Sequence, residues 1–168
     1  DGRPIVTPTQ DIVVGVSYLS KEKPHALGEN KIFANNDEVV IAYNDKAVEL
    51  HAKIKLRINN LFNLEEKKLV TEKQIIATTV GRVIFNQVLP EEFGFVNTEL
   101  NKRTVGDIVA ECYKRFGHAR TIQLLDEIKK LGFEIATLGG ISIGINDLQI
   151  PKAKADVLKE SHAEVAKV

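Results

Sequence analysis

Leu50-His-Ala-Lys-Ile-Lys-Leu-Arg-Ile58 is a stretch in which apolar and polar residues alternate throughout. Successive side chains of a β-strand point to opposite faces, so this alternation predicts a strand with one buried face. The other face carries a basic row, Lys53, Lys55 and Arg57. This is the clearest strand pattern in the chain, and the neighbouring elements can be arranged around it.

The residues that follow predict a partner for this strand. Asn59 to Glu66 is polar and rich in turn-forming residues, and Leu69 to Thr79 is predicted to return as one or two strands. The simplest arrangement is an antiparallel hairpin with an elaborated tip.

Three short helices are predicted around this hairpin from apolar residues at helical spacing. They are a helix that begins after Thr9 and contains Ile12, Val13, Val16 and Leu19, a helix over Glu38 to Tyr43, and a helix over Val80 to Leu89. Asn36 or Asp37 is predicted to cap the second helix, and Pro90 is predicted to end the third.

The second half of the chain is predicted to be helical. Thr104-Val-Gly-Asp107 is typical of a capping box, and an apolar stripe follows it to Phe116. Gly117 is predicted to end this helix, and Gly132 is predicted to end a second helix that begins near Thr121.

A further, polar helix is predicted from Pro151 to Val168. The predicted fold class is therefore α+β. A mixed half of hairpin and short helices, residues 1–97, is followed by a helical half, residues 98–168.

The composition limits the classes of function. Apolar residues make up 43% and charged residues 27% of the chain, as in ordinary globular proteins. The 23 basic and 23 acidic residues cancel, which argues against an independent nucleic-acid binder, because such proteins normally carry a basic excess. Cys112 is the only cysteine, which excludes an intramolecular disulfide and a cysteine-based zinc site. No apolar run reaches the roughly 18–20 residues that span a bilayer, and we expect a cytoplasmic protein.

Few residues indicate chemistry. Gly140-Ile-Ser-Ile-Gly144 matches the nucleophile motif of α/β-hydrolases, but the strand before it and the helix directly after it that this motif requires are not predicted. The basic row could contact phosphates or form a solvated sheet face. From the residues alone, Gln10 and Arg82 are predicted to make caps or packing hydrogen bonds. On these grounds the chain could be a free-standing α+β interaction module without a catalytic role.

A series of motifs resembles the β′ subunit, the largest subunit of bacterial RNA polymerases. In chain order these motifs are Asp1 to Ser20 with Pro8-Thr-Gln-Asp11 at its centre, Leu50 to Arg57, Thr78-Thr-Val-Gly-Arg-Val-Ile-Phe-Asn86, Leu89-Pro90, Phe95-Val-Asn97, Cys112-Tyr113, Leu131-Gly-Phe133, and Ile141-Ser-Ile-Gly-Ile-Asn-Asp147 with Ile150-Pro151. The resemblance covers nearly the whole chain in register. It implies an internal fragment of a large multidomain subunit, and both ends of the sequence look cut.

The resemblance implies an enzyme that transcribes DNA into RNA from NTPs by Mg²⁺-assisted nucleotidyl transfer. In the family the metal is held by the aspartates of Asn-Ala-Asp-Phe-Asp-Gly-Asp, a motif that this sequence lacks. The Mg²⁺ ligands are therefore expected outside this chain. The chain itself is expected to bind no cofactor and to be inactive alone.

The resemblance also implies a place in the polymerase. Residues 1–97 resemble the pore, or secondary-channel, region that lines the route of NTPs. Residues 98–168 resemble the start of the funnel, truncated in the first rim helix. Gln10 matches a family glutamine close to the phosphates of the incoming nucleotide and is the substrate-side candidate. The other candidates, all basic and considered for phosphate contacts, are Lys53, Lys55, Arg57 and Arg82.

The expected partners are those of a whole polymerase: the α, β, ω and σ subunits, the DNA template, the nascent RNA, NTPs, and transcript-cleavage factors at the secondary channel. No membrane partner is expected, and the expected location is cytoplasmic and nucleoid-associated. Lys152-Ala-Lys-Ala-Asp156 departs from the more acidic pattern of the family, so the resemblance says least about factor docking.

Overall fold

The structure is a computed structural model that describes residues 10–139. The motif at Gly140 to Gly144 and the helix predicted from Pro151 lie outside the described residues. Along the chain the elements are α1 (Gln10–Leu19), β1 (Ile32–Phe33), α2 (Asn36–Asn44), β2 (Lys53–Asn63), β3 (Lys68–Thr79), α3 (Val80–Asn86), the 3-10 helix η1 (Glu91–Phe93) and α4 (Lys102–Gly139). This combination confirms the predicted α+β class.

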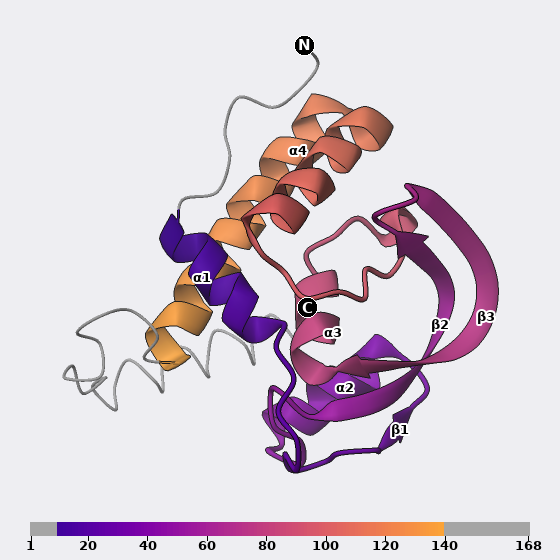
Figure 1. Cartoon of the computed structure of the whole chain (residues 1–168), viewed down its shortest axis with the longest axis vertical. Coiled ribbons are helices and arrows are strands. Elements are labelled where there is room, and N and C mark those ends of the chain that lie inside the picture. The colour runs from indigo at the N-terminus through magenta and orange to yellow at the C-terminus, as the bar shows by residue number, and fades with distance from the viewer. Residues whose placement is uncertain (1–9, 140–168) are drawn as a thin grey trace.

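A curved hairpin of β2 and β3 forms one side of the molecule (Figure 1). The two strands are antiparallel from the pair Lys53–Thr79 to the pair Asn63–Lys68, with one register shift near the middle. The predicted hairpin is therefore confirmed. β1 lies parallel to β2 as a third strand, and the sequence did not predict it because two residues are too few to show a period.

The alternation predicted for β2 is also confirmed. Its apolar residues point into the core, and its basic row is exposed. The buried side chains of this part of the strand are Ile54, Leu56 and Ile58. The pleat of β2 therefore fixes which face of the sheet carries the positive charge.

The hairpin tip is shorter than predicted. β2 continues through Asn59 to Asn63, and the connecting turn is confined to residues 64–67. Phe62 explains the extension, because its ring is buried against Phe93 with 5.0 Å between the ring centroids. Burial of an aromatic ring outweighs the local preference of the asparagines for a turn. Asn63 Oδ1 then closes the turn by accepting the amides two and three residues later, both at 3.0 Å.

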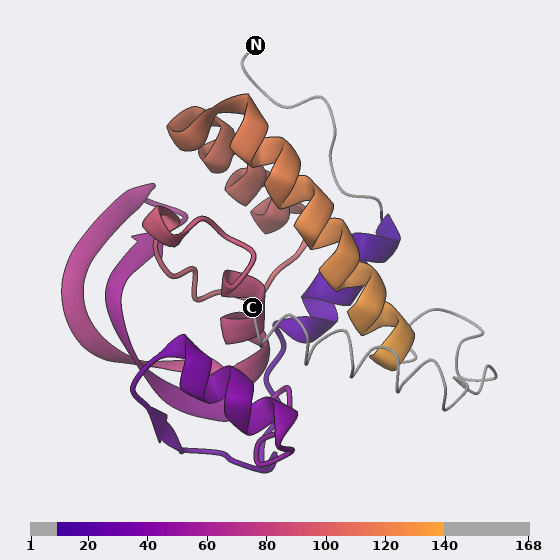
Figure 2. The same cartoon turned by 180° about the vertical axis from the view of Figure 1, so that it is seen from behind.

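Two apolar clusters form the core, and α3 contributes to both. The larger packs α1 against α4 and against the segment between α3 and α4. The smaller lies under the sheet and is closed by α2 (Figure 2). Each large apolar side chain that is fully buried stabilises the fold by roughly 1.5–3 kcal/mol. These clusters are therefore the main source of stability, and they join the sheet to the helices through α3.

α2 and α3 each begin at a side-chain cap. Asn35 Oδ1 accepts the amide of Glu38 at 2.9 Å, so the cap of α2 lies one residue before the first predicted position. Thr79 caps α3 in the same way. α3 ends at Asn86, earlier than predicted, and the Asn86 side chain is bonded to the backbone of Val96 in both directions, at 2.8 and 2.9 Å.

α4 begins one turn earlier than predicted. The amide of Thr104 donates to Asn101 Oδ1 at 2.9 Å, and the amide of Asn101 donates to Thr104 Oγ1 at 2.7 Å. These reciprocal bonds form a capping box with Asn101 as the cap, so the predicted box that starts at Thr104 is wrong. Threonine can act at either end of such a box, which is why the sequence pattern misplaced it.

Glycines shape both the break in α4 and its contact with α1. Gly117 interrupts α4 as predicted, with φ 87°. Gly132 was predicted to end a helix, but α4 continues past it to Gly139. An added Cβ on Gly132 would lie 2.7 Å from Ile12 O, and one on Gly15 would collide with Gly132 O. The two glycines therefore let the backbones of α1 and α4 touch where the helices cross (Figure 1).

Gly15→Ala is expected to destabilise the fold. The methyl group would overlap the backbone of Gly132, and neither helix can move aside without opening the core. We expect the free energy of unfolding, measured by urea denaturation, to fall by about 2–4 kcal/mol. Gly106→Ala is the matched control, because Gly106 is also helical and an added Cβ there meets no atom within 4 Å. The free energy of unfolding of that variant should rise by about 0.5–1 kcal/mol, because alanine has the higher helix propensity. Equal losses of stability in both variants would contradict the backbone contact between α1 and α4.

Cys112 predicts a pH dependence of stability. The side chain is fully buried on α4, and this burial raises the pKa of the thiol above its ordinary value of 9.0, with Thr121 and two nearby arginines opposing part of the shift. The unfolded chain therefore ionises first, so the contribution of the thiol to stability is full below that value and is lost as the pH rises through the folded pKa. The difference in unfolding free energy between the wild type and Cys112→Ala should shrink above pH 9.0. A difference that does not change with pH would contradict this.

Candidate functional site

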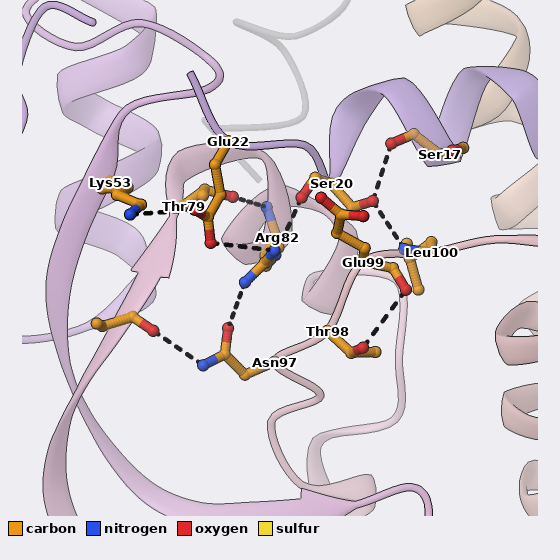
Figure 3. Close-up of polar contacts among 11 residues, drawn as sticks. Ser17, Ser20, Glu22, Lys53, Thr79, Arg82, Asn97, Thr98, Glu99 and Leu100 are labelled. Carbon is orange, nitrogen blue, oxygen red and sulfur yellow. Dashed lines mark hydrogen bonds and ion pairs between the residues drawn. The ribbon is translucent and has the colours of Figure 1, made fainter. Parts of the chain in front are cut away.

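Arg82 lies where α1, the base of the hairpin and the segment before α4 meet (Figure 3). Its own helix fixes its position. The Arg82 amide donates to Thr79 Oγ1 at 3.2 Å, and the amide of the preceding Gly81 donates to Leu50 O at 2.8 Å. The end of α1 packs directly against Gly81, where an added Cβ would collide with Leu19 O. The glycine therefore lets the guanidinium reach the last turn of α1.

The Arg82 guanidinium contacts three separate parts of the chain. Nε donates to Ser20 O at 3.0 Å, and Nη1 donates to Asn97 Oδ1 at 3.2 Å. Nη2 lies 3.5 Å from Glu22 Oε1. Because Arg82 is only 8% exposed, an unpaired guanidinium here would be costly, and these charge-assisted contacts are strengthened by burial. We call Arg82, Ser20, Glu22 and Asn97 the Arg82 junction.

Two members of the Arg82 junction extend it to the neighbouring elements. Ser20 Oγ donates to Ser17 O at 2.9 Å and accepts the amide of Leu100 at 2.8 Å. Asn97 Nδ2 donates to Ala77 O in β3 at 2.9 Å. The end of α1, the sheet and the approach to α4 are therefore tied to one another through the junction.

The structure brings two of the basic candidates together and leaves two apart. Lys53 Nζ lies 3.2 Å from Glu22 Oε2, so Lys53 and Arg82 share one carboxylate. Lys55 and Arg57 lie exposed farther along β2 and make no ion pair within residues 10–139. They can bind an anion without breaking a contact, whereas Lys53 and Arg82 would have to give up Glu22. Phosphate contact at all four stays a prediction.

Gln10 is the first residue of α1. The placement of its side chain lies outside what the structure describes, so its substrate-side role also stays a prediction. Sequence reasoning did not identify Ser20, Glu22 or Asn97, which reach Arg82 from distant positions in the chain. One local signal was available: a charged residue between buried apolar residues of a short helix requires partners.

A cleft of about 520 Å³ lies between the start of α2, the middle of β2, the end of α3 and residues 90–95. Six of its lining residues are Asn35, Asp37, Arg57, Asn60, Gln87 and Glu91. It combines one cation, two carboxylates and several amides. This mixture of charges does not select one class of ligand.

The acidic, histidine and cysteine side chains of the described residues are not clustered as metal ligands. Among residues 10–139, no three or more His, Cys, Asp or Glu side chains are grouped so that they could hold a metal ion. Over the same range, no helix combines the length and the apolar character needed to cross a membrane.

Comparisons with known proteins identify the family. The family model described as RNA polymerase Rpb1, domain 3, matches residues 1–148. The chain belongs to this family. The resemblance found in the sequence motifs is thereby confirmed, and the alternative of an unrelated interaction module is not supported.

Similar proteins named DNA-directed RNA polymerase subunit beta′ match this Rpb1 domain 3 chain along its whole length. The protein from Pelotomaculum thermopropionicum is 45% identical over 168 residues, which is 100% of this chain and 13% of that protein. The protein from Desulforamulus reducens is 44% identical over 168 residues, again 100% and 13%. The protein from Heliobacterium modesticaldum is 43% identical over 174 residues, 100% of this chain and 15% of that protein. The chain thus spans a small part of these relatives.

Arg82→Met is expected to destabilise this Rpb1 domain 3 chain far more than loss of the other cation at Glu22. Methionine keeps the volume of the side chain but leaves Ser20 O and Asn97 Oδ1 without their donors. We expect a loss of about 3 kcal/mol in the free energy of unfolding, measured by urea denaturation. The control is Lys53→Met, which removes an ion pair on an exposed side chain and should cost less than about 1 kcal/mol. Similar losses in the two variants would show that the Arg82 junction is not a main constraint.

Proposed function

We propose that this chain is an internal part of the largest subunit of a DNA-dependent RNA polymerase, which transcribes DNA into RNA from NTPs. The proposal rests on the share of each protein that the matches cover. Relatives named beta′ subunits match the whole chain, yet the chain fills only 13% of the first two of them. We infer that the chain contributes to a nucleotidyltransferase and is inactive alone. The alternative, a free-standing interaction module, has no counterpart in these relatives, which carry this segment inside much longer subunits.

We propose a finer placement on the basis of the ordered motifs. Residues 1–97 would line the pore, or secondary channel, near the active centre, and residues 98–168 would begin the funnel. The physical support is the way the described residues are joined. α1, the hairpin base and the approach to α4 are held by one buried cation, which suits a channel wall that must keep its shape.

In this proposal the chemistry is supplied elsewhere in the polymerase. Mg²⁺ would be held by aspartates outside this chain. The partners would be the α, β, ω and σ subunits, the DNA template, the nascent RNA and NTPs, and transcript-cleavage factors would dock at the secondary channel. A cytoplasmic, nucleoid-associated location follows from these partners.

Gln10 is proposed to act on the substrate side, near the phosphates of the incoming NTP. α1 is anchored at its far end, where Ser20 O accepts from Arg82. It is anchored again along its length, where Gly15 meets Gly132 of α4. A helix fixed at two places holds its first residue in a constant position. From there a glutamine amide can donate a hydrogen bond to a phosphate oxygen.

Gln10→Ala in the assembled polymerase is expected to raise the KM for NTPs about tenfold. One hydrogen bond to a charged group contributes about 1.5 kcal/mol, which corresponds to roughly that factor. The measurement is the NTP dependence of steady-state transcript elongation. Val14→Ala is the control on the same helix, because Val14 is 38% exposed and its truncation should leave the KM unchanged. An unchanged KM in Gln10→Ala would assign Gln10 to packing.

A further inference from the structure

β3 is the last strand of the sheet, whose order is β1–β2–β3. No described strand pairs with its far side, and Figures 1 and 2 both show β3 on the outside of the hairpin. β3 is 12 residues long. An edge strand of this length can pair with another chain unless its main-chain groups are covered.

Hydrogen bonds on the other side of β2 identify the main-chain groups of β3 that face outward. The Lys55 amide donates to Lys31 O at 2.8 Å, away from β3. Ala77 lies opposite Lys55, so this is a non-hydrogen-bonded pair and the N–H and C=O of Ala77 point away from β2. Ile75 lies opposite Arg57, two residues farther along, and its N–H and C=O therefore point outward as well.

The contact at Ala77 agrees with this assignment. Asn97 Nδ2 donates to Ala77 O from outside the hairpin at 2.9 Å, so Asn97 partly covers the edge there. Ile75 has no such cover within residues 10–139, where no group is bonded to its outward N–H and C=O. Its side chain is 54% exposed. The open edge of β3 therefore begins immediately after the part that Asn97 covers.

A second open piece lies toward the hairpin tip. The Phe62 amide donates to Phe95 O at 3.0 Å, again away from β3. The partner of Phe62 across the hairpin is Leu69, whose main-chain groups therefore face outward. The register shift in the middle of the hairpin separates the two pieces. The edge at Ile75 thus fits a short extended segment and not a long strand.

Net positive charge lies beside the open edge, where three exposed cations outnumber the exposed carboxylate of Glu72. Lys55, Arg57 and Lys73 are exposed and form no ion pair with any other described residue. Arg57 is directly opposite Ile75 across the hairpin. A segment along β3 would lie directly beside Lys73 and about 10 Å, two strand spacings, from the backbone of Lys55 and Arg57, a distance that a long cation and a carboxylate side chain can bridge together. Carboxylates on that segment would complement them.

We propose that the outer edge of β3 around Ile75 binds a short, extended, carboxylate-bearing segment from elsewhere in the same polymerase. This identity of the partner rests on the proposed function. The segment adds a strand to the sheet: its main chain exchanges hydrogen bonds with the N–H and C=O of Ile75, and Lys55, Arg57 and Lys73 favour acidic side chains. The chain fills only 13% of a relative such as that of Pelotomaculum thermopropionicum, so most of that subunit is available to supply the segment.

Nucleic acid is the other polyanion that Lys55 and Arg57 could bind. A phosphate backbone accepts hydrogen bonds but cannot also donate to the carbonyl of Ile75 as a peptide does, and it leaves an exposed isoleucine uncovered. The outward main chain and the apolar side chain of Ile75 therefore favour a protein segment. The two partners differ in whether they can also donate a hydrogen bond to the Ile75 C=O, and a cross-link identifies which of them is bound.

The experiment uses the intact polymerase with a photo-cross-linking amino acid in place of Thr71, an exposed residue of β3 that is not one of the three cations, combined with two variants of Ile75. Ile75→Pro removes an N–H that points away from β2, and proline is tolerated at such edge positions. Ile75→Val keeps the N–H and most of the apolar side chain and is the matched control. We expect mass spectrometry to map the cross-link to an acidic, extended protein segment. Its yield should fall about tenfold or more in Ile75→Pro and stay within about twofold in Ile75→Val.

Hydrogen exchange at the Ile75 amide gives a readout that does not depend on any variant. In the wild-type polymerase we expect this amide to exchange at least about a hundredfold more slowly than an unstructured amide. The proposal is overturned by a cross-link to nucleic acid, by the lack of any protein cross-link, by a yield that survives Ile75→Pro, or by an unprotected Ile75 amide. A polymerase that contains this chain, assembles, and makes no RNA from NTPs would instead overturn the proposed function. The cross-link and the exchange of the Ile75 amide would still report whether a segment is bound at the β3 edge.

Discussion

The buried guanidinium of Arg82 is the constraint on which the arrangement of helices and sheet depends. A cation that is only 8% exposed is stable only when hydrogen bonds and an opposite charge replace its water. Its partners are Ser20, Glu22 and Asn97, which lie on both sides of it in the sequence. All three must be in place at once. The end of α1, the hairpin base and the approach to α4 therefore have one relative arrangement, and departures from it leave a buried charge unpaired.

Glycine contacts make this arrangement rigid. Gly81 admits the carbonyl of Leu19, and the pair Gly15 and Gly132 lets α1 and α4 touch along their backbones. Apolar burial alone would tolerate small sliding of one helix over another, because it is not directional. Backbone contact without intervening side chains does not tolerate it. The described residues contain no group of side chains that could hold a metal ion. In the proposed polymerase, this segment would contribute by keeping Gln10 and the channel wall in fixed positions.

Local patterns predicted the elements that depend on neighbouring residues. The alternation in Leu50 to Ile58 predicted β2 and its buried face, and Gly117 correctly marked the break in α4. β1 has too few residues for a period, and it exists because β2 offers an edge to pair with. Gly132 was misread because a glycine gives the same local signal at a helix end and at a helix crossing. The difference lies in α1, which is distant in the sequence, so no local pattern could supply it.

The same distinction between local pattern and distant contact applies to the residues of the candidate site. The basic residue types were visible in the sequence, but whether each cation is paired depends on an acid from another segment. Glu22 forms ion pairs with Lys53 and Arg82, whereas Lys55 and Arg57 form no ion pair with another described residue. The formal net charge of zero conceals this, because electrostatic interactions at physiological salt are screened beyond about 8–10 Å. An approaching group responds to the charges within that range and not to the total. A chain without net charge can therefore still present a basic surface beside an open strand edge.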